Sequence, residues 1–148
     1  MKKILMFVIL TALLLLSSCT KDTKETKSDY AVFLGLLTEN EFQYTEEKPD
    51  TDSFLSVERK PIFIGDEIIS VYEYKSTQEM EKDSTYINPD GYGISRPGNE
   101  VRIDWVSLPH FFKKDTLIIN YVGEDELILK LLTENYGTEF AGNGYTAE

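Results

Sequence analysis

The sequence is poor in the residues that most often carry chemistry: its 148 residues include one cysteine, one histidine and one tryptophan. A single cysteine excludes a framework of intramolecular disulfides and any zinc or iron–sulfur site built from several cysteines. Basic residues are also scarce, with 15 Lys and Arg against 26 Asp and Glu and a formal net charge of −11. So acidic a chain lacks the basic face with which nucleic-acid binders meet phosphates, and no nucleic-acid partner is expected. Its length fits one compact domain and excludes a multidomain enzyme.

A long hydrophobic run is missing too. The longest apolar stretch, Ile4 to Leu16, has 13 residues and is interrupted only by Thr11. Crossing the hydrocarbon core of a bilayer takes about 20 apolar residues, so this stretch is too short to span it. It follows the basic head Met1-Lys2-Lys3 and precedes small residues, which is the pattern of a secretory signal peptide. We therefore assign residues 1–18 to a signal peptide.

The four residues Leu16-Ser17-Ser18-Cys19 resemble the lipobox of bacterial lipoproteins, in which an aliphatic residue and two small residues precede a cysteine. The resemblance implies cleavage before Cys19 and a thioether between its thiol and a diacylglycerol group. It also implies a further acyl chain, such as palmitate, on the new amine. The alternative is an ordinary signal peptide that happens to be followed by a cysteine.

Lipidation at Cys19 predicts where the protein lies. Two acyl chains anchor a protein stably, since each buried CH₂ contributes about 0.8 kcal/mol. The expected partner is therefore the cell membrane, reached through the lipid, with the protein on the extracytoplasmic face. Thr20, and not Asp, follows the cysteine, so in a cell with two membranes the pattern indicates the outer membrane.

Residues 19–29 are expected to form the lipidated cysteine and a disordered tether. Residues 20–29 have no apolar side chain, so they cannot bury surface to offset chain entropy. Their three lysines are balanced by three acids and make no polybasic cluster for anionic lipids. Removal of residues 1–18 takes away two lysines and no acid and makes the net charge more negative, from −11 to −13, which favours a globule held away from the membrane surface.

The remaining residues, 30–148, are expected to form a single globular α+β domain. Helical spacing and capping residues, including the capping box Ser76-Thr77-Gln78-Glu79, predict helices over 30–42, 76–87 and 124–136. Alternation and β-branched or aromatic runs predict an interrupted strand over 54–64 and strands over 67–74, 101–105 and 117–122, with Ile94 leading to a turn at residues 97–99. Residues 108–114 are predicted as a loop and 141–148 as a loose tail. This order predicts a mainly antiparallel sheet with about three helices packed on one face.

The domain also resembles the small uncharacterised lipoproteins of Bacillus-type bacteria. The resemblance is carried by the segments Tyr72-Glu73-Tyr74, Pro109-His110-Phe111-Phe112-Lys113-Lys114 and Tyr121-Val122-Gly123-Glu124-Asp125. It implies a location in the cell envelope but no activity, because that group has none to transfer.

His110 is the only imidazole and so the only candidate histidine for acid–base catalysis. A Ser–His hydrolase would need an acid such as Asp104 or Asp115 and a serine such as Ser107. No serine lies in a G-x-S-x-G pattern. The alternative interpretation of Pro109-His110-Phe111-Phe112 is an aromatic loop that packs on the edge of the sheet.

Aromatic residues are plentiful, with nine Tyr and eight Phe. Tyr72, Tyr74 and Trp105 lie on predicted strands, and an exposed face of such rings would stack on sugars or grip a peptide. The alternative is that they pack in the core. Asp50-Thr51-Asp52 begins like a calcium loop, but Leu55 stands where that loop needs glycine. No metal site is therefore assigned, and no cofactor is expected.

These observations support three functional hypotheses. The first is a non-catalytic, lipid-anchored extracytoplasmic module that binds an envelope protein or glycan through its sheet or the His110 segment. The second is a small cell-envelope hydrolase that uses His110. The third is an accessory or inhibitor subunit whose acidic surface meets a basic partner.

Overall fold

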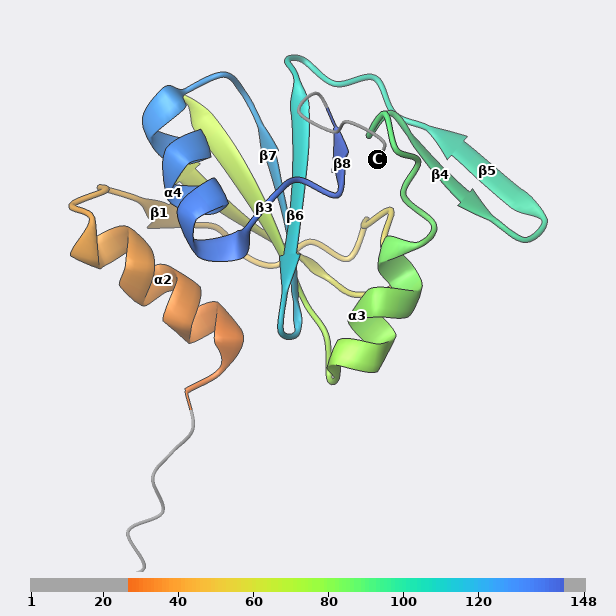
Figure 1. Ribbon diagram of the computed structural model, residues 1–148, viewed down its shortest axis with the longest axis horizontal. Helices are drawn as coiled ribbons and strands as arrows, with labels where there is room; N and C mark the ends of the chain where they lie inside the picture. The colour runs from red at the N-terminus through yellow and green to blue at the C-terminus, as the bar shows by residue number, and fades with distance from the viewer. Residues whose placement is uncertain (1–26, 143–148) are drawn as a thin grey trace, which may run out of the picture.

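The computed structural model describes residues 27–142, and the signal peptide, Cys19 and most of the predicted tether lie outside them. This part of the chain contains three helices and eight strands, whose arrangement can be followed in Figure 1. In chain order they are α2 (Asp29–Glu39), β1 (Thr45–Glu46), β2 (Arg59–Ile64), β3 (Glu67–Glu73), α3 (Thr77–Ser84), β4 (Gly93–Arg96), β5 (Asn99–Arg102), β6 (Pro109–Lys114), β7 (Leu117–Val122), α4 (Glu126–Tyr136) and β8 (Ala141–Gly142). Six strands form one curled antiparallel sheet in the order β1-β2-β3-β7-β6-β8, and β4 and β5 form a separate hairpin.

The three helices begin where the capping residues predict. The side chain of Ser28 accepts a hydrogen bond from the backbone N–H of Ala31, and that of Ser76 accepts one from Glu79. Asp125 accepts two, from the second and third residues after it. These bonds satisfy backbone donors that have no partner inside the helix, and each helix begins within two residues of its predicted start.

The prediction that the helices pack on one face of the sheet is wrong. Helices α2 and α4 cover one face, where Phe33 and Leu132 join a core with Ile119. Helix α3 lies on the opposite face, where Met80 joins a second core with Tyr72. Figure 1 shows α2 and α4 on one side of the sheet and α3 with the β4–β5 hairpin on the other.

The central strands explain this division, because neighbouring residues along them are buried on both faces. Phe111 and Phe112 of β6 are fully buried, as are Ile118 and Ile119 of β7. Successive side chains of a strand point to opposite faces, so each face of this sheet is apolar and needs a cover. Three helices on one face would leave Phe111 and Ile118 in water, at a cost of about 2 kcal/mol for each side chain.

Several predicted boundaries also change. Residues 108–114, predicted as a loop, contain β6, which pairs with β7 along its whole length. Its run of apolar residues on both faces lacks the alternation by which a strand is recognised. Residues 54–57 precede β2 as a loop, and the strand predicted to reach Trp105 ends at Arg102. Ala141 and Gly142, assigned to the loose tail, form β8 on the edge of β6.

Candidate functional site

The largest hollow described lies beside α3, with a volume of about 490 Å³. Two smaller hollows next to α2 and α4 hold about 110 and 200 Å³. The walls of the large one come from α3, from the loop before β2, from the end of β3 and from β4. We call it the α3 hollow, and its lining residues are Ser56, Val57, Tyr74, Lys75, Glu79, Lys82, Asp83, Tyr86 and Arg96.

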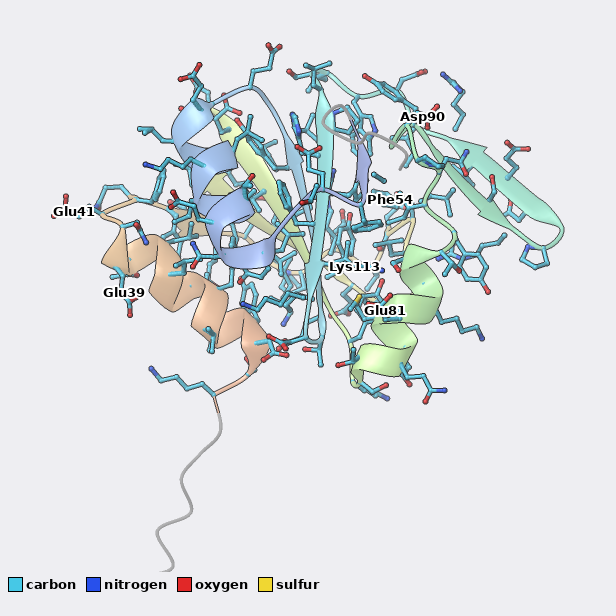
Figure 2. All side chains as sticks on the ribbon, viewed as in Figure 1. Glu39, Glu41, Phe54, Glu81, Asp90 and Lys113 are labelled. Carbon is cyan, nitrogen blue, oxygen red and sulfur yellow. The ribbon has the colours of Figure 1, made fainter. Side chains whose placement is uncertain are left out.

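A buried carboxylate holds these walls together. Asp83 is 4% exposed, and its Oδ2 accepts hydrogen bonds of 2.8 Å from the Tyr74 hydroxyl and from the backbone N–H of Ser56. Its Oδ1 accepts another of 2.8 Å from Nη2 of Arg96. Arg96 also donates from Nη1 to the carbonyl of Phe54, which is labelled in Figure 2. One side chain of α3 therefore joins the loop before β2, strand β3 and the β4–β5 hairpin.

These contacts keep Asp83 ionised. Burial alone would raise the pKa of its carboxyl, but hydrogen bonds from Ser56, Arg96 and Tyr74 together hold the pKa below its usual range. Burial and the hydrogen bond to Asp83 raise the pKa of Tyr74, so its hydroxyl stays protonated as a donor. The pair is thus an anion with satisfied lone pairs, and neither group is poised to exchange a proton with a ligand.

The opposite side of α3 is tied to the sheet. Figure 2 shows Glu81 and Lys113 pointing toward one another, and they form an ion pair beside α3. Lys113 also donates to Ser84 Oγ at 3.1 Å. Helix α3 is therefore held by Lys113 of β6 on one flank. On the other flank it is held by the three groups that donate to Asp83, so the shape of the hollow is set before any ligand binds.

The rim of the hollow carries charge that the protein does not neutralise. Lys75 and Lys82 are exposed, and within residues 27–142 neither ammonium group forms an ion pair. Glu79, the third charged residue of the rim, likewise has no ion-pair partner in that range. On the wall, the Arg96 guanidinium lies 5.3 Å from the centre of the Tyr86 ring. The hollow thus offers free cations at its mouth and a ring surface inside, which suits binding.

The structure does not bring Tyr72, Tyr74 and Trp105 together on an exposed face. Tyr72 is fully buried and Tyr74 is 4% exposed, both in the core under α3. Trp105 is half-buried, its Nε1 donates to the carbonyl of Gly91 at 2.8 Å, and its ring packs edge-on against Phe54 and Phe111. Of the three, Tyr74 alone contributes to the α3 hollow.

His110 is buried on β6, on the face covered by α2 and α4, away from the α3 hollow. Its Nδ1 lies 2.9 Å from a carboxylate oxygen of Glu139 and its Nε2 lies 3.1 Å from the carbonyl of Gly123. The ring stacks on Tyr121 with 5.9 Å between centroids. Both nitrogens are therefore engaged, and no contact joins them to Ser107, Asp104 or Asp115 within the described residues. This geometry gives His110 a packing role and leaves no free nitrogen for a serine nucleophile.

Within residues 27–142, no group of three or more His, Cys, Asp or Glu side chains is arranged to hold a metal ion. Asp50 instead pairs with Arg59 at 3.0 Å and accepts from the backbone of Asp52. Cys19 lies outside these residues, and no helix between 27 and 142 is long and apolar enough to cross a membrane.

Comparison with models of protein families, with curated proteins and with solved structures finds nothing that matches this chain.

Sequence reasoning missed the residues that form the α3 hollow, above all Asp83 and Arg96. One signal was available: on the helix predicted over 76–87, Asp83 is three residues after the apolar Met80 and next to the apolar stripe, where an unpaired acid is costly. The identity of its partners was out of reach, because Ser56 and Arg96 come from distant segments.

Proposed function

We propose that the chain is a lipid-anchored extracytoplasmic lipoprotein that binds a ligand in the α3 hollow without transforming it. The anchor rests on the lipobox-like Leu16-Ser17-Ser18-Cys19. The observation that supports binding is the hollow itself, preformed around Asp83 and bordered by cations that lack protein partners. The engaged nitrogens of His110 favour a binding role over the hydrolase alternative.

The binding surface proposed here is the flank of α3 and not the sheet, where the sequence had placed it. Both faces of the sheet carry a buried core, so little of its aromatic surface is left for a partner. The flank of α3, by contrast, has open volume together with polar and apolar walls. Such a mixed, preformed hollow is where a ligand gains orientation from a few polar groups and affinity from the rest.

The test asks whether a bound ligand protects the rim lysines from chemical modification in the native envelope. Intact cells and purified protein are treated with an amine-acylating reagent, and modification of Lys75 and Lys82 is measured by mass spectrometry. Lys48 and Lys130 serve as internal controls, because both are exposed and neither lines the hollow.

We expect Lys75 and Lys82 to react at least threefold more slowly in cells than in purified protein, with Lys48 and Lys130 unchanged. Equal reactivity of all four lysines in both preparations would refute a bound ligand. A uniform slowing of all four would indicate reagent access and would also count against it.

A further inference from the structure

We propose that the α3 hollow binds an acidic oligosaccharide, with Lys75 and Lys82 each contacting one carboxylate or phosphate of the glycan. This inference rests on the proposed binding function and specifies its ligand. It is carried by the charge of the lining, by the positions of the two lysines along the chain and by the ring surface of the wall.

The charge of the hollow runs against that of the protein. The chain has 26 acids and 15 bases, yet the lining includes three bases, Lys75, Lys82 and Arg96, and two acids. One of those acids, Asp83, is already neutralised by Arg96 at 2.8 Å. Glu79 is then the only acid left against two free lysines, so the mouth of the hollow attracts an anion while the rest of the surface repels it.

The positions of the lysines imply a ligand with two acidic groups. Lys75 immediately precedes the N-cap Ser76, and Lys82 lies in the last turn of α3. Seven residues separate them, which corresponds to about 10 Å along a helix. Anchor points near the two ends of α3 suit the acidic groups of two linked sugar units better than one carboxylate.

The wall of the hollow suits a sugar ring. Tyr86 and Val57 are half-buried and offer apolar surface, and the Tyr86 hydroxyl has no hydrogen-bond partner within residues 27–142. A pyranose presents an apolar face and a rim of hydroxyl groups, which match a tyrosine ring and its polar tip. An acidic peptide would satisfy the charges but would not use this ring surface in the same way.

The experiment measures the affinity of the full chain, purified in detergent micelles, for defined saccharides by calorimetry. The probes are digalacturonate, galacturonate, the neutral disaccharide cellobiose and a triglutamate peptide. We expect digalacturonate to bind about tenfold more tightly than galacturonate, because only the disaccharide engages both lysines. Cellobiose and triglutamate are expected to bind at least tenfold more weakly than digalacturonate.

Variants identify the contacts. Lys75→Ala and Lys82→Ala should each weaken digalacturonate binding about fivefold to tenfold, toward the affinity of galacturonate. Lys48→Ala removes the same charge outside the hollow and should leave the affinity unchanged. Circular dichroism of each variant verifies that it is folded.

Three results would overturn the inference: no binding of digalacturonate, equal binding of cellobiose or triglutamate, or equal affinity of the wild type and the Lys75→Ala, Lys82→Ala double variant. Loss of the acidic-sugar assignment is distinguishable from loss of the binding function. If Lys75 and Lys82 are protected in cells while digalacturonate does not bind, the hollow has a ligand of another class.

Discussion

At the scale of single residues, Asp83 has the largest influence on the proposed site. Its carboxylate is 5% exposed and accepts from three groups that come from three different segments. A buried anion of this kind is tolerated because both of its oxygens accept hydrogen bonds and one of the three donors is a guanidinium. Its removal would leave Arg96 and the Tyr74 hydroxyl without their acceptor.

We predict that Asp83→Asn lowers the free energy of unfolding at neutral pH by about 2 kcal/mol, since breaking a buried pair leaves an uncompensated charge. The expected loss is smaller than for a fully buried ion pair, because the Arg96 side chain is 27% exposed and water can solvate part of its charge. Urea denaturation measures it, with the exposed Asp104→Asn as the charge-matched control. A change within about 0.5 kcal/mol, as for an ordinary surface position, would contradict the prediction.

The same residue predicts a pH dependence. The folded pKa of Asp83 lies below the unfolded value of about 3.9, so the folded state favours its ionised form. Its contribution to stability is therefore present at neutral pH and is lost as the pH falls through the folded pKa. Urea midpoints measured between about pH 5 and pH 2 should fall less steeply for Asp83→Asn than for the wild type; parallel curves would contradict this role.

His110 gives a second prediction at the residue scale. We predict that His110→Ala lowers the free energy of unfolding by about 2 kcal/mol, because it removes a buried stacked ring together with its contacts to Glu139 and the Gly123 carbonyl. Digalacturonate affinity should stay unchanged, since His110 does not line the α3 hollow. A His110→Ala variant that keeps wild-type stability but loses a hydrolytic activity of the wild type would instead support the hydrolase hypothesis.

At the scale of elements, strand β8 is held by a close approach of two backbones. Gly142 pairs opposite His110, and its N–H donates to the carbonyl of Pro89 at 2.9 Å. A Cβ on Gly91 would lie 2.9 Å from the Gly142 Cα, which is too close for real side chains. The loop after α3 and the end of the described chain thus need glycines to pack.

We predict that Gly91→Ala costs about 1 kcal/mol more in unfolding free energy than Gly98→Ala. Both glycines have positive φ, 74° and 77°, so both alanines are strained by a similar amount. Only the first meets backbone atoms, whereas nothing lies within 4 Å of a Cβ on Gly98. Thermal unfolding of the two variants measures the difference. An equal loss of unfolding free energy in both would mean that β8 can shift away from the new Cβ without destabilising the protein.

At the scale of the whole molecule, attachment and binding are expected to be separable. We predict that Cys19→Ala moves the protein out of the membrane fraction, because no other residue of the chain supplies a thiol for the lipid. Fractionation with and without the substitution measures this, and Ser18→Ala, which keeps a small residue before the cysteine, is the matched control. Retention of Cys19→Ala in the membrane fraction would contradict the lipobox interpretation.

The sequence by itself was sufficient for features that depend on neighbours a few residues apart. Ser28, Ser76 and Asp125 mark the helix starts because a cap satisfies a backbone N–H two or three residues later. The scarcity of basic residues and the single cysteine likewise predict, without any structure, that nucleic-acid binding and metal sites built from several cysteines are not to be expected.

Only the tertiary structure decided which faces are covered and which side chains meet. Apolar residues on both faces of β7 were visible in the sequence, but β6 was predicted as a loop, and the side on which each helix packs depends on how the strands pair. Asp83 meets Ser56, 27 residues earlier, and Arg96, 13 residues later, so no local pattern encodes that contact. The α3 hollow exists because sheet register and the path of two loops bring these segments to one place, and those are properties of the folded chain as a whole.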